Sequence, residues 1–255
     1  MIFYFTGTGN SLYVAKRFDE NPISIPQVIN QSNQTFTDKT IGIVCPIYSG
    51  DLPRIVKRFM EKATFNTDYF YFILTYGKDH SAATENANKF AKDLGITVNY
   101  AHTILMVDNY LPVFNIDEER TLDKKIDEQL AAVMADIKSF KSDILEPTEA
   151  GRALYRMAVE RDKNFPSMNN GEQITVKDSC IGCGICTQVC PIGNFYVEEG
   201  IAKRHEETCE FCLSCANNCP QKAIGMKMMD RNPNARYRHE EITLQEIIAA
   251  NNQTI

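Results

Sequence analysis

A pattern of four cysteines occurs twice in the second half of the chain with the same spacing. Residues 180–191 and residues 209–220 both read C-x2-C-x2-C-x3-C-P, and the second copy follows the first by 29 residues. The two copies contain eight of the nine cysteines, whereas Cys45 stands alone in the first half. So dense a set of sulfur ligands fixes how its own backbone must turn, and it constrains the fold of this segment more than any other feature does.

This pattern suits iron better than zinc. Three cysteines spaced by two residues can hold one face of a four-iron cluster, and the cysteine before proline is displaced along the chain. Structural zinc is the alternative, but zinc usually takes its four ligands from two separate C-x2-C pairs. In proteins with two such motifs, the fourth cysteine of each motif binds the other cluster. We therefore expect two 4Fe–4S clusters, one held by Cys180, Cys183, Cys186 and Cys219, and the other by Cys209, Cys212, Cys215 and Cys190.

The cysteine segment resembles the bacterial two-cluster ferredoxins over about 55 residues. A secreted disulfide scaffold is a poor alternative, because such proteins are short and carry a cationic leader, which residues 1–5 do not resemble. The longest apolar run, Tyr69–Tyr76, is far shorter than the roughly 20 residues of a membrane helix. We therefore expect a metal or cluster site in a reducing compartment, no membrane span and a cytoplasmic location.

The first 145 residues alternate between strand-like and helix-like patterns. Apolar, β-prone runs lie at residues 2–5, 41–45, 69–75 and 98–107, with a shorter one at 23–25. Helical patterns lie between them, and the clearest one spans residues 118–142. Near-continuous apolar strands that alternate with helices are typical of a parallel sheet covered on both faces. We predict an α/β fold with a doubly wound parallel sheet, followed by a small α+β domain that holds the cysteines.

The composition changes after Leu145. A proline ends the helical pattern there, residues 151–163 are predicted to form a connecting helix, and a polar stretch follows. We predict a sheet domain at 1–145, a linker at 146–171, a two-cluster domain at 172–228 and a C-terminal tail at 229–255. Thr243 and Glu246 have the spacing of a capping box, which predicts a short helix in the tail.

A glycine-rich turn directly follows the first predicted strand. It consists of Thr6, Gly7, Thr8, Gly9, Asn10 and Ser11, and a helical pattern begins at Asn10. Hydroxyls and backbone amides at the start of a helix suit a phosphate dianion. The turn is not a Walker loop, because no Gly-Lys-Ser/Thr follows it. It is not a dinucleotide fingerprint either, because Leu12 stands where that motif needs a small residue.

This turn resembles the phosphate loop of flavodoxins, and the resemblance extends over residues 1–145. It implies a flavin mononucleotide (FMN), with an empty flavodoxin-like fold as the alternative. The other residues that the resemblance assigns to FMN are Tyr48, Ser49, Gly50, Asp51, Thr75, Tyr76, Gly77, Asn109 and Tyr110. Tyr76 or Tyr48 would stack on the flavin ring, unless each is an ordinary half-buried packing residue. The peptide after Gly50 would turn its carbonyl toward the flavin.

Together the two halves resemble the fused flavodoxin–ferredoxin proteins of anaerobic bacteria and archaea. The resemblance implies an electron carrier that relays electrons between FMN and two clusters, with ferredoxins or oxidoreductases as partners. A flavin-dependent reductase of a small molecule, fed through the clusters, is the alternative, and a cluster-based sensor is a third possibility. The sequence indicates no catalytic acid, base or nucleophile, and it leaves the oligomeric state open.

Charge and isolated residues add further expectations. The chain has 27 Lys and Arg against 33 Asp and Glu, a net charge of −6, so we expect no nucleic-acid binding. The basic run at residues 236–239 is expected to be a solvated loop or a docking site for an acidic ferredoxin. Cys45 ends an apolar strand and is expected to be a buried, inert thiol.

Overall fold

A computed structural model describes residues 1–165, 170–205 and 208–253. The chain packs into two compact units that do not follow the order of the sequence. The sheet unit comprises Met1–Phe5, Ser11–Met106 and Asp123–Arg161. The cysteine unit comprises Thr6–Asn10, Val107–Leu122 and Asp162–Ile255. Most of the glycine-rich loop therefore belongs to the same unit as the cysteines.

Six parallel strands form the core of the sheet unit. They are β1 (Ile2–Tyr4), β2 (Ile23–Ser24), β4 (Thr40–Pro46), β6 (Tyr69–Tyr76), β7 (Tyr100–Leu105) and β8 (Asp143–Ile144). Their order is β2-β1-β4-β6-β7-β8, and every neighbouring pair is parallel. The first five strands have the order of flavodoxin-like sheets, so the predicted fold class is confirmed. A second parallel pair is formed by β3 (Thr35–Thr37) and β5 (Thr64–Asn66).

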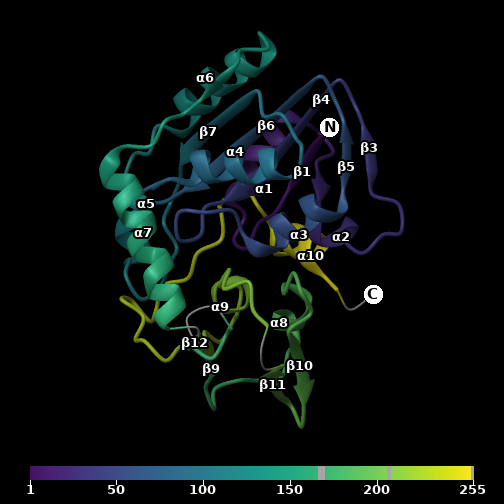
Figure 1. The fold of residues 1–255 in the computed structure, drawn as a ribbon. Helices are drawn as coiled ribbons and strands as arrows, with labels where there is room; N and C mark the ends of the chain where they lie inside the picture. Colours follow the sequence, from purple (N-terminus) through teal and green to yellow (C-terminus); the bar gives the residue numbers. More distant parts are fainter. Residues whose placement is uncertain (166–169, 206–207, 254–255) are drawn as a thin grey trace. The chain divides into compact units, whose positions relative to one another are not determined.

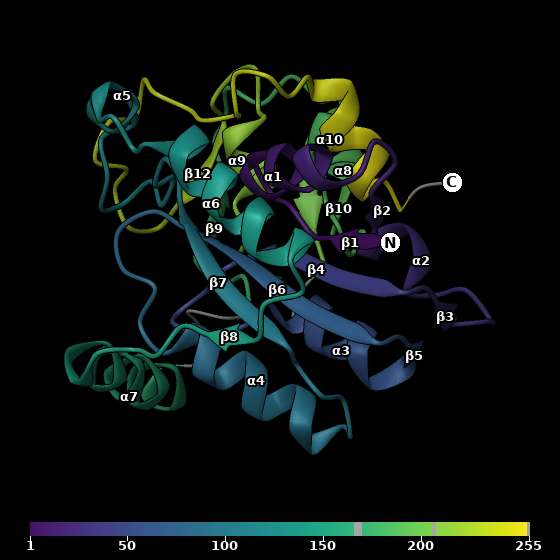
Figure 2. The same cartoon turned by 90° about the horizontal axis from the view of Figure 1, so that it is seen from above.

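The central strands are apolar on both faces because helices cover both faces. The interior of β4 is buried, and so is every residue of β6 except Tyr76. Figure 2 shows α3 (Arg54–Lys62) and α4 (Ala83–Asp93) on one face of the sheet. It shows α1 (Asn10–Phe18) and α6 (Ile126–Lys138) on the other face. The continuous apolar runs in the sequence follow from these three layers.

The helical pattern at residues 118–142 does not form one helix, so that prediction is wrong. It is divided between α5 (Ile116–Thr121), which lies in the cysteine unit, and α6, which lies in the sheet unit. Lys125 precedes α6 in a left-handed conformation with a φ of 52°. Phe140, which the pattern assigns to the buried face, follows α6 and is 45% exposed. The chain passes from one unit to the other inside the pattern, and the left-handed Lys125 interrupts the helix there.

The cysteine unit is built from short elements around the two copies of the motif, which are green and yellow-green in Figure 1. The one-turn helices α8 (Ile185–Gln188) and α9 (Ser214–Asn217) begin at equivalent positions of the two copies. Helix α8 packs on the antiparallel pair of β10 (Phe195–Glu198) and β11 (Ile201–Arg204). Helix α9 packs on the antiparallel pair of β9 (Ile174–Val176) and β12 (Ile224–Met226).

Three further helices complete the described chain. Helix α2 (Ile25–Val28) follows β2 directly, and α7 (Glu149–Asn164) covers the predicted connecting helix. Helix α10 (Leu244–Asn251) opens with the predicted capping box, in which the Thr243 side chain and the Glu246 side chain each accept from the other's amide. Within the three described ranges, no helix combines the length and the apolar character needed to cross a membrane.

Candidate functional site

Burial raises the pKa of one cysteine in each motif, and the charges of nearby cysteines add to this effect. For Cys186 these neighbours are Cys180, Cys183 and Cys219, and its pKa rises to about 12. For Cys215, whose pKa lies well above its usual range, they are Cys212, Cys209, Cys190 and Cys186. Cys219 thus lies near cysteines of the first motif, and Cys190 lies near cysteines of the second. Among the described residues, no three histidine, cysteine or acidic side chains are placed to hold a single metal ion.

Each motif needs a left-handed backbone at two equivalent positions. In the first copy these are Gly182 and Gly184, with φ values of 63° and 76°. In the second copy they are Phe211 and Leu213, both with a φ of 54°. This conformation costs a non-glycine residue roughly 1 kcal/mol or more, which the packing of the buried Leu213 offsets. At Gly182 a side chain has no room, because a Cβ would lie 2.4 Å from the carbonyl oxygen of Gly200.

Backbone amides donate hydrogen bonds to the sulfurs at equivalent places in the two copies. The amide of Asn194 donates to Cys190 Sγ at 3.1 Å. The amide of Ala223 donates to Cys219 Sγ at 3.3 Å. Both donors lie four residues after the displaced cysteine of their motif. Hydrogen bonds to cysteine sulfur are one of the means by which a protein sets the reduction potential of an iron–sulfur cluster.

The side chains of the glycine-rich loop are buried and engaged. Thr6, Thr8 and Asn10 are each at most 9% exposed. The amide of Gly9 donates to Thr6 Oγ1 at 3.0 Å. Asn109 Nδ2 donates to Thr8 Oγ1 at 2.9 Å, so the structure brings this predicted site residue to the loop. Because both hydroxyls accept hydrogen bonds here, their own hydrogens remain able to donate to an anion.

The donors of the loop fit a phosphate group. In the described chain, the amides of Gly7 and Thr8 make no hydrogen bond to a protein acceptor. These amides stand directly before α1, where the helix dipole also favours negative charge. The loop therefore combines unused amide donors with hydroxyl donors, which is the chemistry that a phosphate dianion requires.

The C-terminal tail holds this loop in place within the cysteine unit. The hydroxyl of Tyr237 donates to Asn10 Oδ1 at 2.6 Å, and both residues are buried. The amide of His239 donates to the carbonyl of Thr8 at 2.9 Å. Sequence reasoning missed these contacts, because residues more than 200 positions apart have no common spacing that would reveal them.

The basic run at residues 236–239 packs within the cysteine unit, so the expectation of a solvated loop is wrong. Arg236 Nη2 pairs with Asp230 Oδ2 at 2.9 Å, and their side chains are only 7% and 5% exposed. Arg236 Nε also donates to the carbonyl of Ala216 at 3.1 Å. Arg238 Nε donates to the carbonyl of Ile242 at 3.0 Å. Both cations find partners inside the cysteine unit, which allows the chain to bury the Arg236 side chain and to half-bury Arg238.

The loop after β4 is a tight turn. Tyr48 and Asp51 exchange two backbone hydrogen bonds of 3.0 and 3.1 Å. Between them, Ser49 and Gly50 have φ values of 53° and 78°, as in a type I′ turn. The carbonyl of Gly50 accepts a hydrogen bond from Asn86 Nδ2 at 2.8 Å. In this structure the carbonyl is therefore directed to α4.

Helix α7 contacts this turn, which the sequence did not indicate. Arg161 Nη2 donates to Ser49 Oγ at 2.8 Å. The hydroxyl of Tyr155 donates to Asp51 Oδ2 at 3.4 Å, and Lys57 Nζ pairs with the same carboxylate at 2.6 Å. The polar side chains of the turn are thus held by partners within the sheet unit.

The predicted site residues at the end of β6 have different surroundings. Thr75 Oγ1 and Ser11 Oγ share a hydrogen bond of 2.8 Å, and both residues are buried. The ring of Tyr76 is half-buried and lies edge-on to His80, 5.4 Å away. Burial raises the pKa of Tyr76, so its hydroxyl stays protonated at neutral pH. Gly77 lies in the bend that follows.

Tyr110 lies in the cysteine unit and contacts the second cysteine motif. Its ring is 6.3 Å from the ring of Phe211, and its amide donates to Asp108 Oδ1 at 3.0 Å. Tyr110 also packs against the apolar core of this unit. The position thus has a packing role here, unlike its neighbour Asn109, which reaches the glycine-rich loop.

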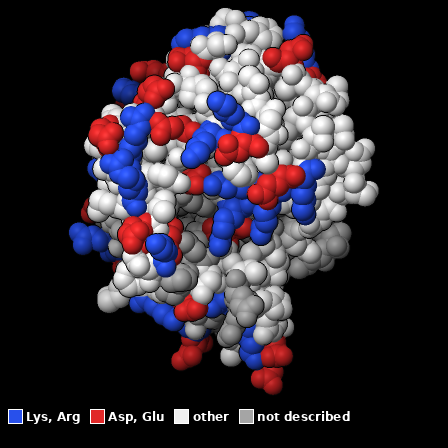
Figure 3. Space-filling model, viewed as in Figure 1, with Lys and Arg blue, Asp and Glu red and all other residues white. Residues whose placement is uncertain are grey.

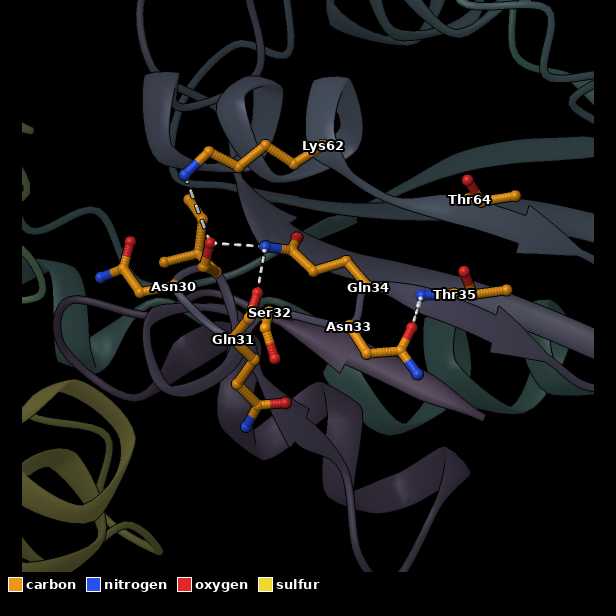
Figure 4. A pocket seen from close by; sticks show the side chains of 9 residues that line it. Asn30, Gln31, Ser32, Asn33, Gln34, Thr35, Lys62 and Thr64 are labelled. Atoms are coloured by element: carbon orange, nitrogen blue, oxygen red, sulfur yellow. Dashed lines mark hydrogen bonds between the residues drawn. The ribbon is translucent and has the colours of Figure 1, made fainter.

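A polar cavity of about 550 Å³ is formed by residues other than the predicted site residues. Figure 4 shows it between the connection from α2 to β3, the end of α3 and the start of β5. Gln34 Nε2 closes the connection by donating to the carbonyls of Ile29 and Gln31 at 2.7 and 3.1 Å. Connections from helix to strand lie at the opposite edge of a parallel sheet from the loops that bind ligands. The cavity therefore does not belong to the predicted site.

Known proteins match the cysteine segment. Residues 179–223 match the family described as 4Fe-4S dicluster domain. An uncharacterized ferredoxin of Methanocaldococcus jannaschii is 37% identical over 62 residues, which are 23% of this chain and 80% of the ferredoxin.

Two further relatives are named as components of larger assemblies. A component of the ion-translocating oxidoreductase complex of Methanosarcina acetivorans is 44% identical over 48 residues, 19% of this chain and 18% of that protein. The PorD component of the pyruvate synthase of Thermotoga maritima is 36% identical over 66 residues, 26% of this chain and 62% of that protein. The match spans less than two thirds of the length of both these relatives.

Proposed function

Since the chain belongs, through its cysteine segment, to the family of 4Fe–4S dicluster ferredoxins, we propose that it is an electron-transfer protein that combines two clusters with FMN. The observation that carries the proposal is the duplicated cysteine motif, whose two copies share equivalent left-handed positions and equivalent amide-to-sulfur hydrogen bonds. One cluster is held by Cys180, Cys183, Cys186 and Cys219, and the other by Cys190, Cys209, Cys212 and Cys215.

In this proposal the glycine-rich loop binds the phosphate of FMN. The support is that the loop follows β1 of a sheet with the flavodoxin-like strand order, and that its amides and hydroxyls provide donors for a dianion. The proposed contacts of the phosphate are Thr6, Gly7, Thr8, Gly9, Asn10 and Ser11. The resemblance to flavodoxins adds Tyr48, Ser49, Gly50, Asp51, Thr75, Tyr76, Gly77, Asn109 and Tyr110 as proposed contacts of the rest of FMN.

With these groups bound, the protein can connect one-electron transfer with two-electron transfer. FMN, when bound, supplies exchange of one or two electrons, whereas a 4Fe–4S cluster exchanges one. The chain itself binds the phosphate, buries the sulfurs and donates backbone hydrogen bonds to them. No acid or base is required of it, because the electrons pass to and from other redox proteins.

The proposed partners are therefore redox proteins. Two relatives are named as components of an ion-translocating oxidoreductase complex and of pyruvate synthase. The net charge of −6, together with the charge of ligated clusters, favours partners with a basic docking patch. On the face drawn in Figure 3, acidic and basic side chains are interspersed, so docking there depends on local charges. A reducing compartment such as the cytoplasm suits this function, since the thiols must stay free for iron.

The test is anaerobic purification followed by measurement of iron, sulfide and flavin. We expect about eight irons and one FMN per chain. Cys186→Ala is expected to lose about half of the iron, while the matched Cys45→Ala variant keeps all of it. Tyr76→Ala is expected to release FMN with the iron unchanged. A colourless protein that holds zinc would refute the cluster assignment, and failure of the iron-loaded protein to bind added FMN would refute the flavin assignment.

A further inference from the structure

The two cysteine groups differ in their access to solvent. We call Cys180, Cys183, Cys186 and Cys219 the outer group, and Cys190, Cys209, Cys212 and Cys215 the inner group. In the outer group, Cys183 is exposed, and the neighbouring Ile181 is 60% exposed. In the inner group, all of whose members the structure describes, Cys190 and Cys215 are buried and the other two are only partly accessible. A cluster in the outer group thus has an edge at the surface.

The inner group touches the glycine-rich loop. A Cβ built on Gly7 would lie 2.7 Å from the carbonyl oxygen of Cys212 and 3.2 Å from its Cβ. The two backbones are therefore in van der Waals contact, with no room for a methyl group between them. Tyr237 and His239 hold the neighbouring residues Asn10 and Thr8 from the tail, so we expect a displacement of Gly7 to disturb Cys212.

The two groups meet in the interior of the cysteine unit. Cys186 lies in α8 and Cys215 lies in α9, and these two helices pack against each other. Both side chains are buried and belong to the same apolar core. The exposed Cys183 stands directly before the N-cap of α8, and Cys212 stands directly before the N-cap of α9, so the packing of the two helices connects the two groups.

We propose that the two cluster sites have fixed and different roles, with the outer group exchanging electrons with a redox protein that docks around Cys183 and the inner group adjoining the flavin loop. The role of the loop rests on the flavin part of the proposed function, and the membership of the two groups rests on its cluster part. The partner at the outer site is a one-electron carrier. In each exchange the redox centre of the partner loses one electron and the outer cluster gains it, or the reverse. No atom is transferred.

Electron paramagnetic resonance of the dithionite-reduced, two-cluster protein tests the order of the sites, that is, which of the two cluster sites is nearer to solvent. Cys183→Ser and Cys212→Ser each replace one sulfur ligand by oxygen, and the signal that changes in each variant identifies its cluster. A soluble gadolinium chelate, added to the wild-type protein, relaxes spins near the surface. We expect it to remove the power saturation of the signal assigned by Cys183 and to leave the signal assigned by Cys212 unchanged.

Gly7→Ala tests the contact between the loop and the inner group. We expect the signal assigned by Cys212 to shift and the signal assigned by Cys183 to stay as in the wild type. The matched control is Gly225→Ala in β12 of the same unit, where a Cβ would meet only the Asp230 carboxylate at 3.8 Å. This control should leave both signals unchanged.

Several outcomes would overturn the proposal. Equal relaxation of the two signals by the chelate, or stronger relaxation of the one assigned by Cys212, would show that the outer group is not the accessible one. A shift of the Cys183 signal in Gly7→Ala would place the loop against the wrong cluster. If Gly7→Ala loses its iron, the chelate measurement on the wild type still decides the order. None of these readouts needs FMN, so failure to bind flavin refutes the proposed function and leaves the order of the sites standing.

Discussion

The hydrogen bond between Tyr237 and Asn10 allows a quantitative test of how the tail holds the loop. Tyr237→Phe removes the one hydroxyl that donates to Asn10 Oδ1 at 2.6 Å. Asn10 cannot turn to compensate, because its Nδ2 donates to the carbonyl of Val107 at 3.0 Å. The acceptor is then left buried without a donor, which costs about 1–3 kcal/mol. Burial raises the pKa of Tyr237, so in the wild type the hydroxyl remains a donor across the neutral range.

The cost should appear as easier local opening of the loop. A free energy of about 1–3 kcal/mol corresponds to roughly a 5- to 160-fold rise in the opening equilibrium. Hydrogen exchange followed by mass spectrometry under anaerobic conditions measures this for peptides that cover residues 5–15. The amide of Gly9, which donates to Thr6 Oγ1, is the reporter within that peptide. Exchange of the peptide that covers β6 should stay as in the wild type.

The matched control is Tyr196→Phe, which makes the same chemical change in β10. Tyr196 is 36% exposed, and its ring packs on His205 at a centroid distance of 4.8 Å. It should leave exchange of the loop unchanged. Unaltered loop exchange in Tyr237→Phe, or an equal rise in both variants, would show that the tail does not hold the loop.

Three further results are expected. Asp230→Ala leaves the buried guanidinium of Arg236 without its carboxylate and should destabilise the protein by about 3–5 kcal/mol. The cluster absorbance should then be lost at a lower temperature, and an unchanged transition would contradict the buried pair. Gly182→Ala places a Cβ 2.4 Å from the carbonyl oxygen of Gly200 and should cost about half of the iron, so full iron content would refute the close approach. Cys45 is fully buried, and burial raises its pKa, so the thiol stays protonated. Iodoacetamide at about pH 8 should therefore modify it only after unfolding, and rapid modification of Cys45 in the native protein would be inconsistent with this.

The sheet could be predicted from the sequence because its pattern is local. The apolar runs around Ile43 and Phe72 become the two central strands, and both residues are fully buried. The cysteine motif is equally local, since its spacing determines which backbone turns can place the sulfurs. In both cases the signal and the structure extend over the same short stretch of chain.

The composition of the cysteine unit could not be predicted, because it depends on contacts between distant segments. Asn10 and Tyr237 meet although 227 positions separate them. The pairing of Arg236 with Asp230 likewise converts a run that looks solvated into part of a core. Periodicity describes one segment at a time, so it cannot show which distant segment supplies the missing partner.

The break between α5 and α6 has a related cause. The apolar spacing of residues 118–142 fits one helix, but its first part packs in one unit and its later part in the other. Lys125 takes a left-handed conformation at the junction. The residue types at this position do not predict that conformation. Helical periodicity predicts which face of a helix is apolar. Here one part of that apolar face packs in the core of the cysteine unit, and the other part packs in the core of the sheet unit.

During synthesis on the ribosome, residues 6–10 leave the exit tunnel long before the residues that fix them. Asn251 Nδ2 donates to the carbonyl of Thr6 at 3.0 Å, so one of these contacts waits for a residue 245 positions further along the chain. A nascent chain can therefore assemble β1, β4 and β6 while the turn after β1 is still unconstrained. Maturation of that turn, and with it any uptake of a phosphate-bearing ligand, is expected to follow the synthesis of α10.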